Sequence, residues 1–120
     1  MNIHNFRELK IWQKSRFLAK DLHPIILTFP KYEIYGMMSQ MQRASVSLAC
    51  NIAEGSGRVS TKEFQHYLTI TNGSLFELET LLELAQDFKY INNEQYIEFI
   101  ERITELKKMI FVFYNSLNKN

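Results

Sequence analysis

The 120-residue chain is the size of a single domain, which can bury about two-thirds of its unfolded surface. Its 46% hydrophobic and 22% charged residues are typical of a globular protein and exclude a disordered one. The longest apolar run, residues 109–114, is too short to span a membrane, and the first residues lack the layout of a signal peptide. We therefore expect a cytoplasmic protein without a membrane partner. The single cysteine, Cys50, excludes an internal disulfide and a cysteine metal cluster.

The net charge of +1 is unevenly distributed along the chain. Residues 1–62 contain nine Lys or Arg and four Asp or Glu, whereas residues 63–120 contain five and nine. Such an asymmetry is typical of complementary helix faces within a fold or oligomer, and also of a nucleic-acid footprint. Both interpretations stay open at this point.

An amphipathic helix is predicted over residues 9–28, where apolar positions recur with the helical period. Pro24 lacks the amide hydrogen that a helix uses, so a kink or local break is expected near residues 21–23. A second helix is predicted over residues 32–54, with Ile34 and Leu48 among the residues that face the core. Gly55 then serves as a C′ residue, because glycine adopts the left-handed conformation without steric cost.

A third helix is predicted from Ser60 to about residue 88, since Ser60 and Glu63 have the spacing of a capping box. The small residues Gly73 and Ser74 in its middle are expected to let another helix approach closely. Asn92 or Asn93 caps a fourth helix, which extends to about residue 117.

Four helices with short connections predict an all-α fold, an antiparallel up-and-down four-helix bundle that forms one domain over residues 1–120. The last turns of the fourth helix are apolar nearly all round, at Met109, Phe111 and Val112. Such a helix needs burial on more than one side, which a single bundle does not give to its outer face. We therefore expect an oligomer.

A polar stripe follows one side of the second predicted helix, from Gln40 to Glu54 with spacings of three and four residues. Antiparallel packing on the third helix pairs residues whose numbers sum to about 117, which places Gln40 near Glu77 and Arg43 near Ser74. Two polar stripes then meet, and we infer that Arg43 pairs with Glu77. We predict a partly buried network that fixes helix register and subunit packing. Its members are Gln40, Arg43, Asn51, Glu54, Arg58, Glu63, Ser74 and Glu77.

Enzymatic function finds little support in the sequence. Glu54 and Glu63 could share a proton, but general acid–base catalysis also needs a substrate cleft, which a packed bundle rarely provides. The histidines are scattered, and none forms the Glu-x-x-His pair of di-iron bundles. We predict no enzymatic activity, no catalytic residue, no metal site and no cofactor.

The runs FRELKIW (6–12), YGMMSQ (35–40), NIAEG (51–55) and GSLFELE (73–79), in this order, resemble the bacterial four-helix-bundle proteins of the 23S rRNA intervening-sequence family. The similarity extends over nearly the whole chain. It implies an up-and-down bundle that assembles as a homopentamer. It also implies a relation to the accessory protein of diversity-generating retroelements, a basic pentamer that engages nucleic acid.

Two functional hypotheses follow. In the first, a non-enzymatic oligomer binds RNA or DNA weakly through a basic surface on the first two helices, by salt-sensitive phosphate contacts. In the second, the oligomer is a protein-binding scaffold without a nucleic-acid partner, and the charge asymmetry acts between subunits. The candidate phosphate contacts are Arg7, Lys10, Lys14, Arg16, Lys20, Arg58 and Lys62.

Overall fold

A computed structural model of the chain describes residues 5–119, which form four long helices. These are α1 (Lys10–Ile26), α2 (Met37–Ser56), α3 (Thr61–Asp87) and α4 (Asn93–Ser116). Short 3-10 helices precede, connect and follow them: η1 (Phe6–Glu8), η2 (Lys31–Glu33) and η3 (Leu117–Lys119). The described residues contain no strand, so the predicted all-α, four-helix fold is confirmed. In that part of the chain, no helix combines the length and apolar character that crossing a membrane requires.

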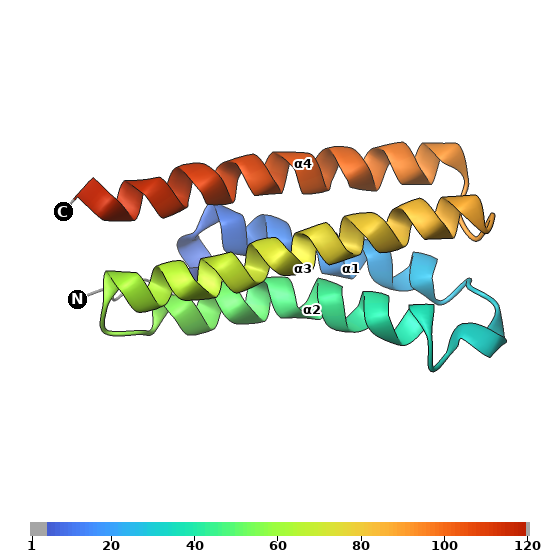
Figure 1. The fold of residues 1–120 in the computed structure, drawn as a ribbon, viewed down its shortest axis with the longest axis horizontal. Helices are drawn as coiled ribbons and strands as arrows, with labels where there is room; N and C mark the ends of the chain where they lie inside the picture. Colours follow the sequence, from blue (N-terminus) through green and yellow to red (C-terminus); the bar gives the residue numbers. More distant parts are fainter. Residues whose placement is uncertain (1–4, 120) are drawn as a thin grey trace.

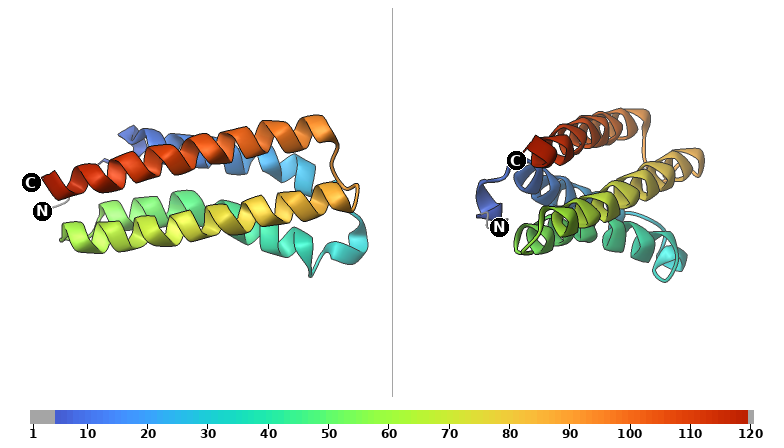
Figure 2. Two further views of the ribbon diagram at one scale, coloured as in Figure 1. Left: turned by 45° about the horizontal axis from the view of Figure 1, so that its top comes forward. Right: turned by 60° about the vertical axis from the view of Figure 1, so that its left-hand side comes forward.

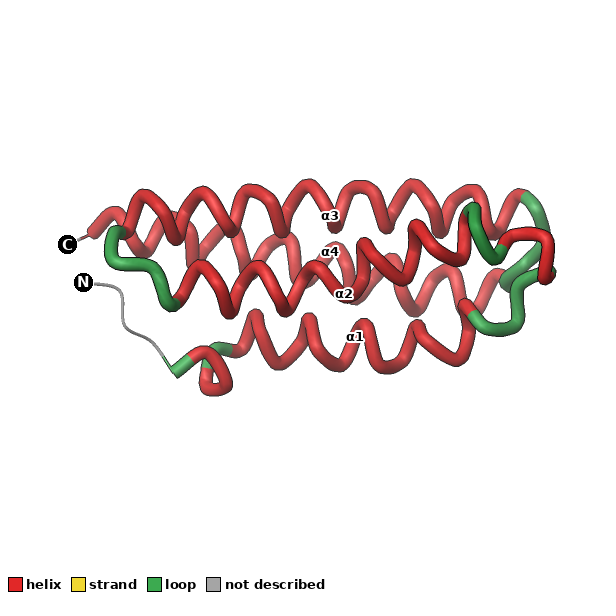
Figure 3. Tube along the Cα trace, turned by 90° about the horizontal axis from the view of Figure 1, so that it is seen from below, coloured by secondary structure: helices red, strands yellow, loops and turns green. Residues whose placement is uncertain are grey.

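Consecutive helices lie side by side, and the chain turns back at each short connection (Figure 1). The bundle is elongated, with extents of 47 × 24 × 20 Å. α1 contacts α2 and α4, and α3 contacts the same two helices, so α1 and α3 are diagonal neighbours. Figures 2 and 3 show this separation of α1 from α3.

The hydrophobic core runs between the four helices. Leu22 of α1, Leu48 of α2, Leu75 of α3 and Ile103 of α4 are all fully buried. Each such side chain stabilises the fold by about 1.5–3 kcal/mol relative to its exposed state. The helical periodicity of the sequence identifies this core because one stripe of every helix faces it.

α1 continues through Pro24 to Ile26, so the break predicted near residues 21–23 is wrong. Pro24 lies in the last turn of the helix, and its ring is exposed to solvent. Only two residues of the helix follow it. The amide hydrogen that proline lacks therefore costs α1 one backbone hydrogen bond close to its end. Leu27 still donates its amide hydrogen to the carbonyl of His23.

α2 begins at Met37, five residues later than predicted, because Glu33 satisfies its first turn. The Glu33 carboxylate accepts the Met37 amide hydrogen at 3.2 Å and the Tyr90 hydroxyl at 2.8 Å. This carboxylate thereby links the α1–α2 connection to the α3–α4 connection at one end of the bundle. Ile34, predicted to face the core, lies in the turn before α2 and is 53% exposed.

The starts of α3 and α4 follow the predicted caps. Ser60 accepts the Glu63 amide hydrogen at 3.1 Å, which confirms that half of the predicted capping box. Asn92 and Gln95 form a complete capping box at the start of α4. These local side-chain signals explain why both helix starts are readable from the sequence.

Candidate interaction surfaces

α2 and α3 approach each other closely at Gly55. A Cβ atom built on Gly55 would lie 2.7 Å from the Cβ of Tyr67 and 2.9 Å from the Cδ1 of Phe64. Gly55 is buried inside α2, and no glycine of the described residues has a positive φ, so its predicted left-handed role is wrong. The close approach predicted at Gly73 is also wrong, because nothing lies within 4 Å of a Cβ built there.

The α2–α3 seam, meaning the packed contact between these two helices, has a register one helical turn away from the prediction. Ser47 donates its hydroxyl hydrogen to the Oγ of Ser74 at 2.8 Å, and Tyr67 donates to Glu54 at 3.0 Å. Both pairs sum to 121. The chain leaves α2 at Gly57 in a right-handed conformation and becomes extended at Ser60. Residues 57–60 connect the two helices, so each residue of α2 faces a residue of α3 about four positions later in the sequence than predicted, which is one helical turn.

Most of the predicted polar network is absent from the seam. Arg43 and Glu77 are both exposed and form no ion pair within residues 5–118. Gln40 is also exposed, and Asn51 donates to the Ser47 carbonyl of its own helix. The residues that lose their predicted contacts are Gln40, Arg43, Asn51 and Glu77, and Ser74 contacts Ser47 in place of Arg43. Arg58 keeps its predicted pairing with Glu54, whose hydrogen bond raises the pKa of Arg58, and the Glu63 carboxylate also contributes to that rise.

Glu54, Arg58 and Tyr67 form a hydrogen-bonded cluster at the end of the seam near the α2–α3 turn. Arg58 donates from Nη2 to the Glu54 carboxylate at 2.7 Å and to the Tyr67 hydroxyl, and its guanidinium lies 4.9 Å from the Tyr67 ring centroid. The hydrogen bond from Arg58, followed by that from Tyr67, lowers the pKa of Glu54 below its ordinary value. The hydrogen bond to Glu54 raises the pKa of the Tyr67 hydroxyl. The Arg58 guanidinium therefore already has hydrogen-bond partners within the chain.

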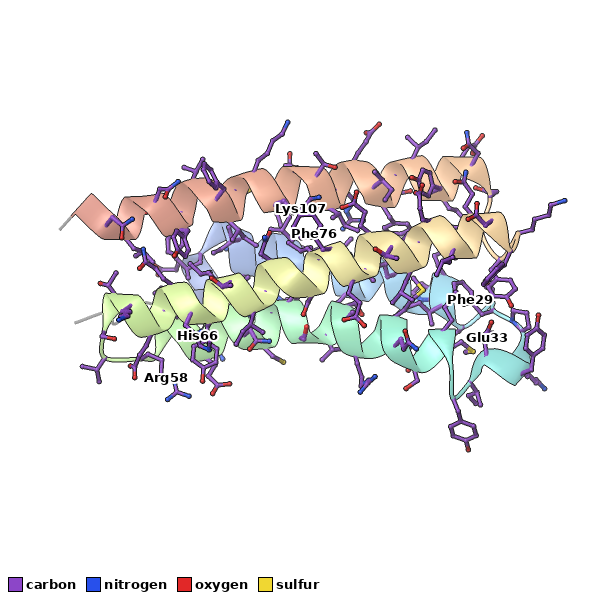
Figure 4. The ribbon with its side chains drawn as sticks, in the orientation of Figure 1. Phe29, Glu33, Arg58, His66, Phe76 and Lys107 are labelled. Carbon is purple, nitrogen blue, oxygen red and sulfur yellow. The ribbon has the colours of Figure 1, made fainter. Side chains whose placement is uncertain are left out.

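Beside this cluster lies a hollow of about 410 Å³ with the exposed Lys62 and His66 in its lining. Figure 4 shows Arg58 and His66 at this end of the bundle. Glu63 also lines the hollow, so the site contains charges of both signs. Within residues 5–118, no three His, Cys, Asp or Glu side chains are grouped closely enough to hold a metal ion.

The free cations among the predicted phosphate contacts are concentrated on α1. Lys10, Arg16 and Lys20 are exposed and form no ion pair within the described residues. Lys14 differs from them, because its Nζ lies 2.9 Å from a Glu105 carboxylate oxygen of α4. Arg7 lies on η1, with its guanidinium 4.5 Å from the Phe6 ring centroid. The structure therefore separates these α1 cations from Arg58 and Lys62 at the α2–α3 turn.

Charge is polarised across the bundle. α1 carries four Lys or Arg and one Asp, a net charge of +3, whereas α3 carries one Lys and five acidic residues, a net charge of −4. These two helices are diagonally opposite each other (Figure 3). α2 contributes only Arg43 and Glu54 and is neutral overall. The near-neutral net charge of the protein thus conceals a basic side and an acidic side.

An aromatic residue that sequence reasoning missed lies among the cations of α1. Phe17 is 45% exposed. The Arg16 guanidinium lies 5.6 Å from its ring centroid and the Lys20 Nζ lies 5.8 Å away. Its spacing of three residues from both Lys14 and Lys20, on the side of the helix away from the core stripe, is the sequence signal that could have identified it. We call Lys10, Arg16, Phe17 and Lys20 the α1 face.

The C-terminal half of α4 carries an exposed apolar ridge formed by Phe111 and Val112, each 67% exposed. A groove of about 730 Å³ between α3 and α4 lies on one side of it, where Phe76 is exposed. A second groove of about 580 Å³, between α4 and the start of α1, lies on the other side. Figure 4 shows Phe76 and Lys107 between α3 and α4. The predicted apolar surface of this helix is therefore uncovered in the single chain.

Comparisons with known proteins agree with this fold. A sequence model of the family described as 23S rRNA-intervening sequence protein matches residues 7–112. Among solved structures, the chain is similar to a protein of unknown function from the S23 ribosomal protein family of Bacteroides thetaiotaomicron. The two are 25% identical in sequence with a TM-score of 0.81, and the match covers 88% of this chain and 95% of that chain. No curated protein matches.

Proposed function

The chain belongs to the 23S rRNA-intervening sequence protein family, and we propose that it is a non-enzymatic, self-assembling protein that binds RNA through the α1 face. The observation that carries the proposal is the set of uncommitted cations on that face. Lys10, Arg16 and Lys20 have no carboxylate partner within the described residues, and α3, the helix with the largest negative net charge, is diagonally opposite. α4, which contacts α1, carries four acidic and three basic residues, so the attraction of a polyanion to this side rests on the cations of α1 itself.

Binding of this kind is electrostatic and independent of sequence. Phosphate contacts by lysine and arginine release counterions, so the affinity falls steeply with salt. Lys14 and Arg58 rank below the three free cations because each already has a carboxylate within the chain. Arg7 and Lys62 are exposed, and we assign them a peripheral role near the ends of the bundle.

The test measures the binding of a fluorescein-labelled rRNA fragment by anisotropy at low salt. Simultaneous replacement of Lys10, Arg16 and Lys20 by Glu is expected to weaken binding at least about tenfold. Lys89→Glu is the matched control, since Lys89 is exposed at the α3–α4 turn. Equal affinities for the wild type and the triple variant would exclude the α1 face as the RNA site.

A protein-binding scaffold without a nucleic-acid partner is the second candidate function, and the α4 ridge favours it. We propose that the ridge and its two grooves are subunit contacts of an antiparallel up-and-down bundle, and that the oligomer is the homopentamer implied by the family resemblance. Exposed apolar surface of this extent is typical of an interaction site. In this alternative, the basic α1 side meets the acidic α3 side of another copy.

The two functions are separated by the behaviour of the same triple variant in two assays. RNA binding through the α1 face predicts lost RNA affinity, with an unchanged sedimentation coefficient when only Arg16 and Lys20 are replaced, because Lys10 also lines the second groove. The scaffold alternative predicts the reverse, a changed sedimentation coefficient and no RNA binding by either protein.

A further inference from the structure

The α1 face contains an exposed aromatic ring, and simple phosphate neutralisation does not account for it. Phe17 lies in the middle of α1 and keeps 45% of its surface exposed. Arg16 and Lys20 lie over its ring at 5.6 and 5.8 Å from the centroid, so a base that stacks on the ring takes the place of one of these two cations. Two further cations lie on the same side of the helix, Lys14 at i−3 and Lys10 at i−7.

A small hollow lies beside this ring, between α1 and α4. It measures about 170 Å³ and is lined by Lys14, Phe17, Leu18, Arg102, Glu105 and Leu106. This volume is below the ~300 Å³ at which small-molecule sites begin, so the hollow is too small for a whole metabolite. Arg102 also holds Asp21 at 2.9 Å, which keeps that acidic residue of α1 paired.

We propose that the α1 face is a site for single-stranded RNA, in which Phe17 stacks on one unpaired base while Lys10, Arg16 and Lys20 contact the flanking phosphates. The proposal rests on the proposed RNA-binding function and specifies the form of RNA that is bound. Cations around an exposed aromatic ring are the combination that single-strand binding proteins use, because every base presents a π-face. In a duplex the bases are already stacked inside the helix and cannot reach the ring.

Charge complementarity favours RNA over a protein partner at this place. The three cations form no ion pair within the described residues, and Asp21 of α1 and Glu105 of α4 are both held in ion pairs, whereas Glu8 lies beside Lys10 without one. The net charge of +3 on α1 matches a polyanion. A second copy that used its acidic α3 to cover α1 would bury Phe17 as well, and that arrangement is an outcome of the test below.

The test titrates the assembled protein against a short single-stranded oligoribonucleotide and against its duplex, with anisotropy as the readout. Wild type is expected to prefer the single strand. Phe17→Leu keeps an apolar side chain, and we expect it to lose at least about fivefold in single-strand affinity, with duplex affinity unchanged; Phe17→Ala should lose about 5- to 150-fold. Phe88→Leu is the control, because Phe88 is also exposed and lies at the α3–α4 turn.

A second measurement locates the contact directly. Photocrosslinking of a 5-iodouridine oligoribonucleotide is expected to modify the peptide that contains Phe17, which mass spectrometry identifies. Crosslinks confined to other peptides, or single-strand affinity unchanged in Phe17→Leu, would overturn the proposal while leaving electrostatic RNA binding intact. A changed sedimentation coefficient in Phe17→Leu would assign the ring to a subunit contact instead. Absence of RNA binding by wild type would overturn this inference and the proposed function together.

Discussion

The α2–α3 seam and the α4 ridge differ in how far contacts within the single chain cover their side chains. In the seam, Gly55 lets α3 approach closely, Ser47 bonds Ser74 across it, and the Glu54–Arg58–Tyr67 cluster closes its end. At the ridge, Phe111 and Val112 remain exposed between two apolar grooves. The difference teaches that the seam is satisfied within one chain, whereas the chain leaves the ridge uncovered, as the proposed subunit contact expects.

The largest expected effect concerns the ridge. Val112→Glu places a charge on the proposed subunit contact and is expected to reduce the particle to the 14.3 kDa of one chain, since a buried unpaired carboxylate is strongly unfavourable. Sedimentation velocity measures this change. Val46→Glu is the matched control, because Val46 is a 56% exposed valine on α2, outside both grooves. If Val112→Glu sediments as wild type does, the ridge is not the contact.

The next largest effect concerns the seam. Gly55→Ala forces a methyl group to within 2.7 Å of the Tyr67 Cβ, so α3 must shift outward. Overpacking of this kind lowers the free energy of unfolding by about 1–3 kcal/mol, and urea denaturation measures the loss. An unchanged unfolding midpoint would show that the seam is looser than these contacts indicate.

Gly73→Ala is expected to raise the free energy of unfolding, whereas Gly55→Ala is expected to lower it. Gly73 lies in the middle of α3 with open space around it, so a methyl group meets no neighbour. Alanine is favoured over glycine within a helix by up to ~1 kcal/mol, and the variant should be more stable by about that amount. A destabilised Gly73→Ala variant would indicate that another chain covers this surface. Repeating the denaturation below the assembly concentration tests this, because the loss of stability should then disappear.

The smallest effect is a pH dependence at the end of the seam. The folded pKa of Glu54 is lowered by hydrogen bonds from Arg58 and then Tyr67, so its stabilising contribution is present above its ordinary pKa of 4.5 and is lost as the pH falls through the folded pKa. Tyr67→Phe removes one of these bonds. Wild type and Tyr67→Phe should therefore differ at neutral pH and converge in acid, as measured by thermal unfolding. A constant difference down to acid pH would contradict the Glu54–Tyr67 contact.

The sequence predicted the parts of the fold that depend on local signals. The core stripe, the Ser60 and Asn92 caps and the exposed apolar half of α4 follow from side chains close together in sequence. The register of α2 against α3 depends instead on the backbone conformation of residues 57–60, which no local pattern specifies. The close contact expected at Gly73 occurs at Gly55 instead, whereas Arg43 and Glu77 are exposed and form no ion pair within residues 5–118.

Only part of the candidate site was predicted, because some of its features are local in the sequence and others depend on helix packing. Lys10, Arg16 and Lys20 were identified because cations on one helix can be counted from the sequence. Their freedom depends on tertiary contacts, since Lys14 looks like them in the sequence but is paired with Glu105 of α4 in the fold. The diagonal placement of the basic α1 and the acidic α3 likewise appears only once the helices are packed.

The salt dependence of RNA binding tests the central claim most directly, because it counts the phosphate contacts made by the α1 face. The logarithm of the association constant, plotted against the logarithm of salt concentration, gives a slope that falls by about one for each phosphate contact removed. The account predicts that replacing Lys10, Arg16 and Lys20 by Glu reduces the magnitude of this slope by about two to three. Identical slopes for wild type and the triple variant would contradict it.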